Sequence, residues 1–314
     1  MRVLIVGGGA LGTVMAGRLS RAGNDVTLFV KPAQAAALAG GQVEITGILE
    51  CTVPVRITAN ADNLGHFDCL MLCVKGRDTE AALEPLRDVD VDAVLSLQNG
   101  VKKNETLAEI FGRERVLGAI ASVSGEMKAP GRVLHTAAAV LDLGELDGHA
   151  SPRCERIAAM VQEAGIPSSC VPDIGRREWQ KLTLYMGIGL VSALTRVATV
   201  TMIFDPDLGP VCARVARETA DVAAAEGYDL NLTEAGARQM LEGFAGPIRD
   251  RGVVHWLSLV QDLMAGRPTE LEATAGDVLA RARRHALAAP TIDACTNMLR
   301  AVERLAPPGG RSAG

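Results

Sequence analysis

Hydrophobic positions in the first half of the chain come in short runs, separated by stretches with helical periodicity. Such runs are typical of strands that are buried on both faces of a parallel sheet. They predict strands over residues 3–6, 26–30, 70–74, 93–97 and 115–120, with a later strand over 133–143. Residues 43–58 alternate more and predict a small β excursion, while helices are expected over 32–39, 78–86 and 151–164. This order indicates an α/β domain with a doubly wound sheet.

The pattern changes after Pro172, where strand signals nearly vanish and helical periodicity takes over. Helices are expected over residues 176–193, 206–226, 233–243, 270–285 and 290–305, with breaks at Gly227 and at Gly246 and Pro247. We therefore expect a Rossmann-type domain over residues 1–172, an all-helical domain over 173–306 and a disordered tail at 307–314. An active site is expected in the cleft between the two domains.

The first predicted strand runs directly into Gly7-x-Gly9-x-x-Gly12, and an apolar helical stretch follows. In a dinucleotide-binding unit the first glycine allows a tight turn, the second lets a pyrophosphate approach the backbone, and the third lets the helix pack closely. The motif predicts that Gly7, Gly9, Ala10, Leu11 and Gly12 bind a nucleotide at the N-terminus of that helix. The alternative is a tight turn with a purely structural role.

The end of the second strand bears on the choice of nucleotide. An NAD-binding unit carries an acidic residue there, which accepts hydrogen bonds from the ribose 2′-hydroxyl. This chain has none, and the strand is followed by Lys31, a cation that could pair with a 2′-phosphate. The pattern favours NADP over NAD, with an ordinary solvated lysine as the alternative.

Composition narrows the class of protein. A chain of 314 residues suits two domains, and its net charge of −5 argues against nucleic-acid binding. No apolar run approaches the roughly 20 residues of a membrane span, and the N-terminus reads as a strand instead of a signal peptide, so a cytoplasmic location is expected. The 7 cysteines and 5 histidines show no ligand spacing, and no metal site is expected.

Several polar residues interrupt apolar surroundings. Lys75 and Asn99 each follow an apolar strand, where ligands sit in open α/β sheets; a surface lysine and a turn asparagine are the alternatives. Lys181 lies on a strongly apolar helix, and a partly desolvated lysine there could give up its proton in catalysis. An exposed lysine on an apolar stem is the alternative. Ser258 and Asp262 share one face if their stretch is helical.

Taken together, these elements resemble the ketopantoate reductase (2-dehydropantoate 2-reductase) family. The order and spacing of the matching motifs hold from Met1 to about Glu303. The motifs are Gly7-x-Gly9-Ala10-Leu11-Gly12, Cys73-x-Lys75, Leu97-Gln98-Asn99-Gly100, Trp179-x-Lys181-Leu182, Ser258-x-x-x-Asp262 and Thr269-Glu270.

The resemblance implies an NADPH-dependent oxidoreductase that reduces a 2-oxo acid to the 2-hydroxy acid, ketopantoate to pantoate in pantothenate biosynthesis. Six residues fall on family positions with known roles. By position, Lys31 meets the 2′-phosphate, Lys75 and Asn99 lie near the nicotinamide and the substrate, Lys181 is the general acid, Glu270 holds the substrate and the active-site hydrogen bonds, and Ser258 contacts the substrate's carboxylate end.

The chain departs from the family at two positions. Members that act on ketopantoate carry asparagines four and eight residues after the lysine, where this chain has Tyr185 and Gly189. These positions share a helix face with Lys181, so the change bears on substrate binding. Tyr185 could bind or protonate the substrate, or only pack.

The sequence leaves three functions open, the second of them because of Tyr185 and Gly189. The protein reduces ketopantoate, or it is a paralogue that reduces another 2-oxo acid or an imine, or it is a non-catalytic NADP-binding sensor. The partner is expected to be a small molecule, and the long apolar helices of the second half would suit a homodimer interface.

Overall fold

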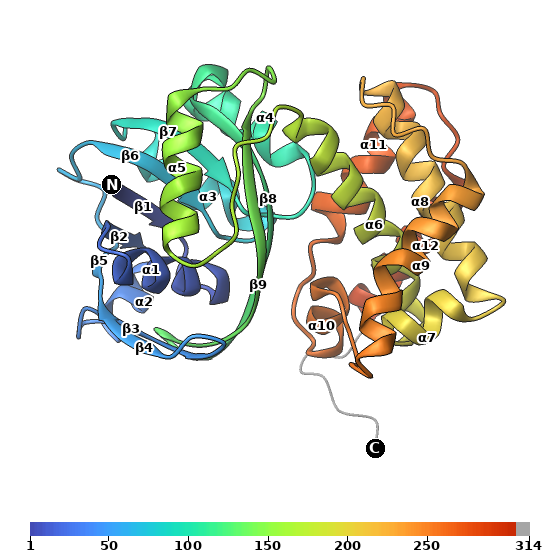
Figure 1. Cartoon of the computed structure of the whole chain (residues 1–314), viewed down its shortest axis with the longest axis horizontal. Helices are drawn as coiled ribbons and strands as arrows, with labels where there is room; N and C mark the ends of the chain where they lie inside the picture. The colour runs from blue at the N-terminus through green and yellow to red at the C-terminus, as the bar shows by residue number, and fades with distance from the viewer. Residues whose placement is uncertain (306–314) are drawn as a thin grey trace. The chain divides into compact units, whose positions relative to one another are not determined.

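The computed structural model describes residues 1–305, so the tail expected at 307–314 lies outside the described residues. The chain forms two compact units (Figure 1). The first contains Met1–Gln98 and Lys102–Gly175, and the second contains Asn99–Val101 together with the chain from Arg176 onwards. Asn99, which follows a strand of the first unit, is thus a residue of the second.

The first unit is built on a single nine-stranded sheet with the order β4-β3-β9-β8-β7-β6-β1-β2-β5. Its strands are β1 (Arg2–Val6), β2 (Asp25–Phe29), β3 (Gln42–Gly47), β4 (Cys51–Pro54), β5 (Arg56–Thr58), β6 (Phe67–Leu72), β7 (Val91–Ser96), β8 (Val116–Ala129) and β9 (Arg132–Glu145). Strands β5, β2, β1, β6, β7 and β8 run parallel, whereas the β8–β9 and β3–β4 pairs are antiparallel. The predicted α/β class is confirmed, with a mixed sheet.

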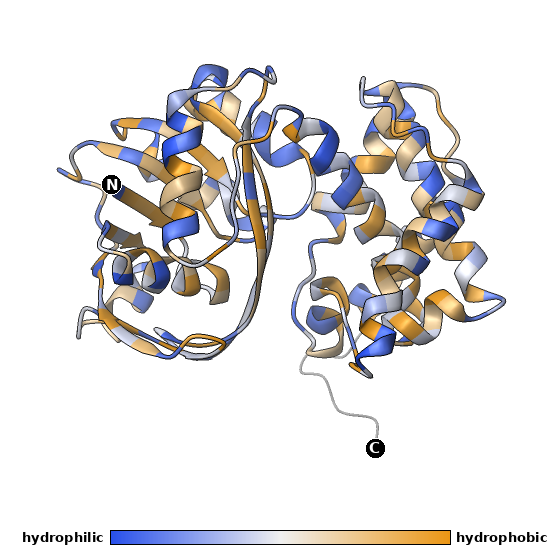
Figure 2. Cartoon of the chain, viewed as in Figure 1, coloured by the Kyte–Doolittle hydropathy of each residue, from blue (hydrophilic) through white to orange (hydrophobic). Residues whose placement is uncertain are grey.

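Helices cover both faces of this sheet. They are α1 (Ala10–Arg21), α2 (Pro32–Ala37), α3 (Thr79–Leu83), α4 (Lys102–Phe111) and α5 (Pro152–Glu163). Val3 and Ile5 of β1 belong to a core with α1 and α5, whereas Leu4 and Val6 belong to a core with α3 and α4. Because successive side chains of a strand point to opposite faces, one apolar run supplies both cores. The strands are largely hydrophobic in Figure 2.

The sheet is wider than the apolar runs predict. The β excursion at residues 43–58 joins it at both edges, because β3 pairs with β9 while β5 pairs with β2. Strands β8 and β9 have 14 residues each and extend past the predicted ends. Beyond Ile120, exposed and less exposed residues alternate along β8. This alternation is typical of an antiparallel hairpin with one solvated face, which a search for apolar runs misses.

The second unit is helical. Its helices are α6 (Ile174–Thr195), α7 (Thr199–Phe204), α8 (Leu208–Ala225), α9 (Glu234–Asp250), α10 (Ser258–Met264), α11 (Asp277–Arg284) and α12 (Pro290–Leu305), with a π-helical turn at Glu272–Gly276. They share one hydrophobic core. Within residues 1–305, none of the helices combines the length and hydrophobicity needed to cross a bilayer.

One predicted break in this unit is wrong. Helix α9 continues through Gly246 and Pro247 to Asp250. Ala245 is fully buried, so the apolar face of α9 persists up to the proline. Pro247 itself is exposed, and the carbonyl of Gly243, which loses its helical N–H partner, belongs to an exposed residue that water can reach.

Candidate active site

The glycine turn joins β1 to α1, and each of the three motif glycines, Gly7, Gly9 and Gly12, has its own geometric surroundings. Gly7 has a φ of 107°, and a β-carbon there would lie 2.6 Å from Cγ1 of Val74. A β-carbon at Gly12 would lie 1.8 Å from the carbonyl oxygen of Gly7, so only glycine lets α1 start against the strand end. Gly9 is exposed, and a β-carbon there would meet no atom within 4 Å. Two glycines are thus needed for packing and one leaves open space.

The open space lies at the N-terminus of α1. Gly9 is the N-cap residue and offers no side-chain acceptor to the first N–H groups, which include those of Ala10 and Leu11, and the first turn holds no acidic residue. Free N–H groups and the positive end of a helix dipole attract an anion. Gln34 of α2 donates a hydrogen bond to the carbonyl of Gly8 at 2.5 Å, a contact that the sequence did not reveal. The residues present fit the diphosphate of a dinucleotide.

Lys31, which follows β2, and Arg77, which follows β6, both pair with the carboxylate of Asp78. Nζ of Lys31 lies 3.4 Å from Oδ1 of Asp78, and Nε of Arg77 lies 3.6 Å from Oδ2 of the same residue. The side chain of Lys31 is 75% exposed. Lys75 is half-buried, and its carbonyl accepts the N–H of Asp78 at 2.8 Å. No sequence motif points to Arg77 and Asp78, although they follow Lys75 almost directly.

The second unit brings three of the predicted site residues together. Nζ of Lys181, on α6, donates to Oδ1 of Asn99 at 3.3 Å. Nδ2 of Asn99 in turn donates to Oε2 of Glu270 at 3.2 Å, across 171 residues of sequence. All three residues are half-buried. The amide presents its oxygen to the ammonium and its NH₂ group to the carboxylate, which is the orientation that satisfies both charges.

Backbone contacts fix two of these residues, Asn99 and Glu270. Gly100 has a φ of 89°, and a β-carbon there would lie 2.6 Å from the carbonyl oxygen of Ala273. The segment after Asn99 is therefore seated directly on the π-helical turn. The carbonyl of Glu270 accepts hydrogen bonds from N and Oγ1 of Thr274, at 3.1 and 2.9 Å. Asn99 and Glu270 are thus both fixed to the same turn.

Tyr185 and Ser258 form a second polar contact in this unit. Tyr185 is 7% exposed, and its Oη lies 3.4 Å from Oγ of Ser258 at the start of α10. Burial raises the pKa of the Tyr185 phenol, so it is a neutral hydrogen-bonding group at ordinary pH. A β-carbon at Gly189 would lie 3.4 Å from Leu259 and 3.7 Å from Leu257. A β-carbon at Gly189 would thus make ordinary van der Waals contacts with apolar side chains.

Asp262 has a structural partner. The stretch that carries it is helical, as the pattern allowed, and its carboxylate accepts a hydrogen bond from Nε of Arg267 at 2.9 Å. Asp262 is buried, and the backbone N–H of Arg267 also binds its carbonyl at 2.8 Å. Asp262 therefore closes the turn after α10.

Among the described residues, one group of side chains could hold a metal ion. It consists of His66, Asp68 and Asp92, whose ligand atoms lie within 4.8 Å of one another. His66 pairs with Asp90 and Asp92, and Asp68 accepts the N–H of Arg2 at 2.7 Å. The group lies at the start of β6 and β7, whereas the glycine turn follows the end of β1, so we assign it no part in the candidate site.

Comparisons with known proteins match both units. The family model described as "Ketopantoate reductase PanE/ApbA" matches residues 3–148, and the model described as "Ketopantoate reductase PanE/ApbA C terminal" matches residues 173–303. A protein of Archaeoglobus fulgidus named 2-dehydropantoate 2-reductase is 30% identical over 302 residues, which are 96% of this chain and 98% of that protein. A Vibrio cholerae protein of the same name is 27% identical, with 97% and 98% covered.

Solved structures agree on the fold. A PanE/ApbA family ketopantoate reductase from Ralstonia eutropha JMP134 superposes with a TM-score of 0.83 at 26% identity, covering 97% of this chain and 99% of that one. D-mandelate dehydrogenase, solved with NADH and anilino(oxo)acetate, gives a TM-score of 0.86 at 20% identity with the same coverage. With both family models matched in order along nearly the whole length, the chain belongs to the ketopantoate reductase family.

Proposed function

We propose that the protein is an NADPH-dependent reductase that converts the ketone of a 2-oxo acid to the 2-hydroxy acid, with ketopantoate as the substrate and pantoate as the product. The names of the relatives support the substrate. The observation that carries the reaction is the hydrogen-bonded line from Lys181 through Asn99 to Glu270. It joins a proton donor to groups that orient it.

The first unit would hold the cofactor. Gly7, Gly9 and Gly12 shape the turn, and the uncapped N-terminus of α1 would receive the diphosphate. Lys31 would pair with the 2′-phosphate, and Lys75, after β6, would reach the nicotinamide end. When bound, the cofactor supplies the hydride that adds to the carbonyl carbon.

Lys181 would protonate the carbonyl oxygen. Negative charge builds on that oxygen during reduction, and a nearby ammonium both offsets the charge and donates the proton. Asn99 holds Nζ of Lys181 in place, and Glu270 fixes the amide of Asn99 from its other side. Ser258 and Tyr185 would bind the substrate through their hydroxyl groups.

Steady-state kinetics test this proposal. NADPH consumption is measured with ketopantoate and with a panel of other 2-oxo acids, each with NADH as the alternative reductant. The expected result is turnover of ketopantoate with NADPH at the highest kcat/KM of the panel. Negligible turnover of ketopantoate would show that the substrate is another one.

The residues at positions 185 and 189 support a second class of substrate. Where ketopantoate-reducing members carry two asparagines, this chain has a buried phenol bound to Ser258 and a glycine packed by Leu257 and Leu259. Such a wall offers one hydroxyl and apolar surface, and favours a 2-oxo acid whose side chain lacks the hydroxyl group of ketopantoate. Branched apolar 2-oxo acids therefore belong in the panel, and a higher kcat/KM for one of them would support this alternative.

A further inference from the structure

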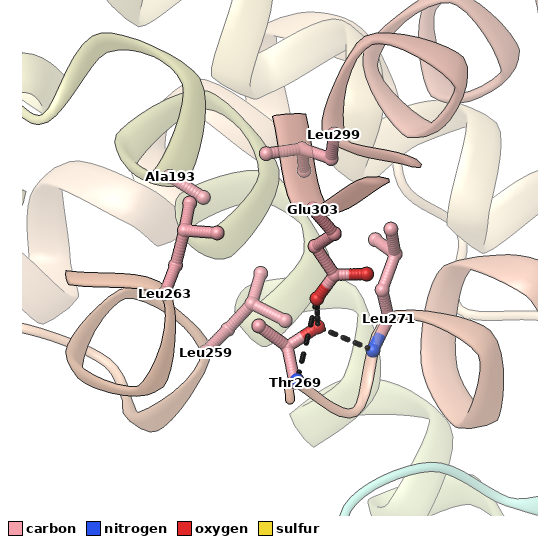
Figure 3. Close-up of a pocket in the computed structure, with 7 residues that line it drawn as sticks. All are labelled: Ala193, Leu259, Leu263, Thr269, Leu271, Leu299 and Glu303. Atoms are coloured by element: carbon pink, nitrogen blue, oxygen red, sulfur yellow. Dashed lines mark hydrogen bonds between the residues drawn. The ribbon is translucent and has the colours of Figure 1, made fainter. Parts of the chain in front are cut away.

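Helix α12 holds the residue directly before Glu270. Oε1 of Glu303 accepts hydrogen bonds from the backbone N–H and the hydroxyl of Thr269, at 3.3 and 2.5 Å. The same hydroxyl oxygen accepts the N–H of Leu271 at 3.1 Å (Figure 3). One side chain of α12 thus fixes the backbone on both sides of Glu270.

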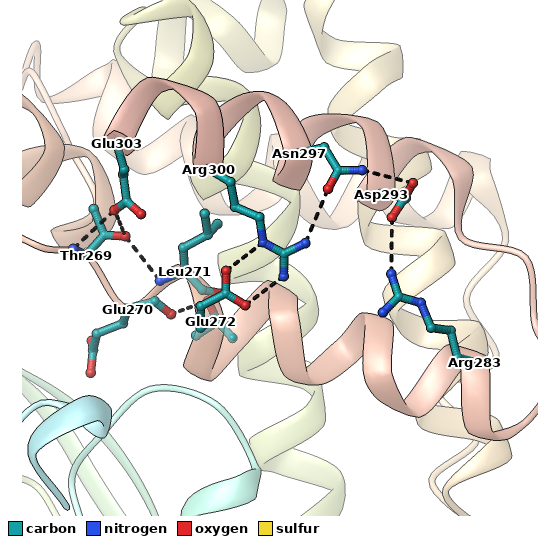
Figure 4. Close-up of polar contacts among 10 residues, drawn as sticks. Thr269, Glu270, Leu271, Glu272, Arg283, Asp293, Asn297, Arg300 and Glu303 are labelled. Atoms are coloured by element: carbon teal, nitrogen blue, oxygen red, sulfur yellow. Dashed lines mark hydrogen bonds and ion pairs between the residues drawn. The ribbon is translucent and has the colours of Figure 1, made fainter. Parts of the chain in front are cut away.

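The same helix also holds Glu272. Arg300 binds its carboxylate with two hydrogen bonds, Nε to Oε1 and Nη2 to Oε2, both at 2.6 Å (Figure 4). The hydrogen bonds from Arg300 lower the pKa of the Glu272 carboxyl, so the pair is charged at neutral pH. Arg300 and Glu303 are three residues apart and therefore lie on the same face of α12.

Helix α12 is itself well anchored. The buried carboxylate of Glu218 on α8 accepts the N–H groups of Thr291 and Ile292 at the first turn of α12. Near its other end, Leu299 and Leu271 line a small depression with Ala193, Leu259 and Leu263, and Thr269 and Glu303 border it (Figure 3). This depression has no room for a water molecule, so it is a packing seam and not a ligand site.

The segment that α12 holds contains an irregular helix. The π-helical turn at Glu272–Gly276 carries one residue more per turn than an α-helix. If it relaxed to an ordinary α-helix, residues before it would rotate by about 100° relative to those after it. Glu270 directly precedes this turn, so its direction depends on what keeps the turn in place.

We propose that Glu303 and Arg300 are positioning residues for Glu270, which hold its carboxylate toward Asn99 by fixing Thr269 and Glu272 against α12. The inference rests on the proposed function, since Glu270 matters there as the end of the line from Lys181. Glu303 and Arg300 bind Thr269 and Glu272, and act on Glu270 through the backbone of residues 269–272.

Glu303→Ala is the decisive variant, with Glu303→Gln as its conservative partner. The alanine variant is expected to lower kcat about tenfold, because the reacting groups are misplaced. The KM for NADPH should be unchanged, because the first unit, which is proposed to hold the cofactor, is intact. Glu303→Gln keeps an oxygen that accepts both hydrogen bonds of Thr269, so it should recover most of the lost kcat. Arg304→Ala is the control, because Arg304 is an exposed charged residue of the same helix and is no part of the hydrogen bonds to Thr269 and Glu272.

Crystal structures of the wild type and of Glu303→Ala supply a readout that needs no activity. The distance between Oε2 of Glu270 and Nδ2 of Asn99 is expected to grow from 3.2 Å beyond hydrogen-bonding range in the variant. An unchanged kcat and an unchanged distance would overturn the inference while leaving the reductase intact. If the wild type reduces no 2-oxo acid, the proposed function fails, and the distance alone decides the inference. Should Glu303→Ala not fold, Thr269→Ala removes the same hydroxyl contact from the other side.

Discussion

The glycine turn and the cluster of Lys181, Asn99 and Glu270 are encoded in the sequence in opposite ways. The turn is made by six consecutive residues, and its geometry is a property of the backbone, since a β-carbon at Gly12 would collide with the carbonyl of Gly7. The cluster is made by three side chains that lie up to 171 residues apart and meet through hydrogen bonds. Local geometry can be recognised from a short motif, whereas an assembled cluster depends on the packing of every element that carries it.

The two regions should therefore fail differently when they are changed. A substitution in the turn is limited by space, so its effect depends on what the new atom meets. A substitution in the cluster leaves the backbone in place and removes a chemical group. We expect the first kind to change stability and cofactor binding, and the second to change turnover.

Among the substitutions, Lys181→Ala is expected to show the largest difference between loss of turnover and loss of cofactor binding. Loss of a general acid typically lowers the rate by a factor of 10²–10⁴, so kcat is expected to fall about 1000-fold. The glycine turn is untouched, so the Kd for NADPH, measured by fluorescence titration, should stay within about twofold of the wild type. Lys102→Ala, which removes an exposed lysine at the start of α4, is the control and should leave both values unchanged. Turnover within tenfold of the wild type would show that Lys181 is not the acid.

Much of the fold follows from local patterns. The apolar runs that predict β1, β2, β6 and β7 are buried on both faces, and one run can supply two cores only if helices cover both. The pattern is weaker where one face is solvated, as in β8 and β9. It is also misleading at Pro247, where an exposed position lets a proline stay inside α9.

The candidate site likewise has residues that local motifs predict and residues that only tertiary contacts reveal. The motifs and the family resemblance named Lys181, Asn99 and Glu270, and the structure joins them in one hydrogen-bonded line. Glu303 and Arg300 could not be found in this way, because a surface acid and a surface arginine on an amphipathic helix look like many others. Their importance arises only from the tertiary contact with Thr269 and Glu272.

Two substitutions in the glycine turn, Gly12→Ala and Gly9→Ala, separate its effect on stability from its effect on cofactor affinity. A methyl group at Gly12 meets a backbone oxygen at 1.8 Å, so α1 must move, and the free energy of unfolding should fall by about 3 kcal/mol. At Gly9 the methyl group meets no atom within 4 Å, so the loss of stability should not exceed about 1 kcal/mol, the typical cost of alanine at an N-cap. The methyl group would instead occupy the space offered to the diphosphate, and the Kd for NADPH should rise about tenfold.

Urea denaturation and cofactor titration of both variants measure these two effects separately. Gly40→Ala is the matched control, since a β-carbon there also meets nothing within 4 Å and Gly40 belongs to another segment, between α2 and β3. An unchanged Kd in Gly9→Ala would contradict the assignment of this space to the diphosphate. Equal losses of stability at Gly9 and Gly12 would contradict the distinction between packing and open space.

The smallest expected effect lies at Asp78 in the first unit, where the substitution changes a charge and leaves the backbone geometry alone. Its carboxylate pairs with Lys31 at 3.4 Å and with Arg77 at 3.6 Å, and would repel a 2′-phosphate that uses the same cations. Asp78→Asn removes this charge without removing a helix cap, because the side chain of Asp78 makes no capping hydrogen bond to α3. Lys31 is largely exposed, so the gain is limited to about 1 kcal/mol, or about fivefold in the ratio of the Kd for NADH to the Kd for NADPH. Fluorescence titrations with both nucleotides measure that ratio, and Asp88→Asn, at an exposed acid of the same unit, corrects for the change in net charge. A ratio that falls in Asp78→Asn would mean that the carboxylate supports NADPH binding, by holding Lys31 and Arg77 in place instead of competing for them.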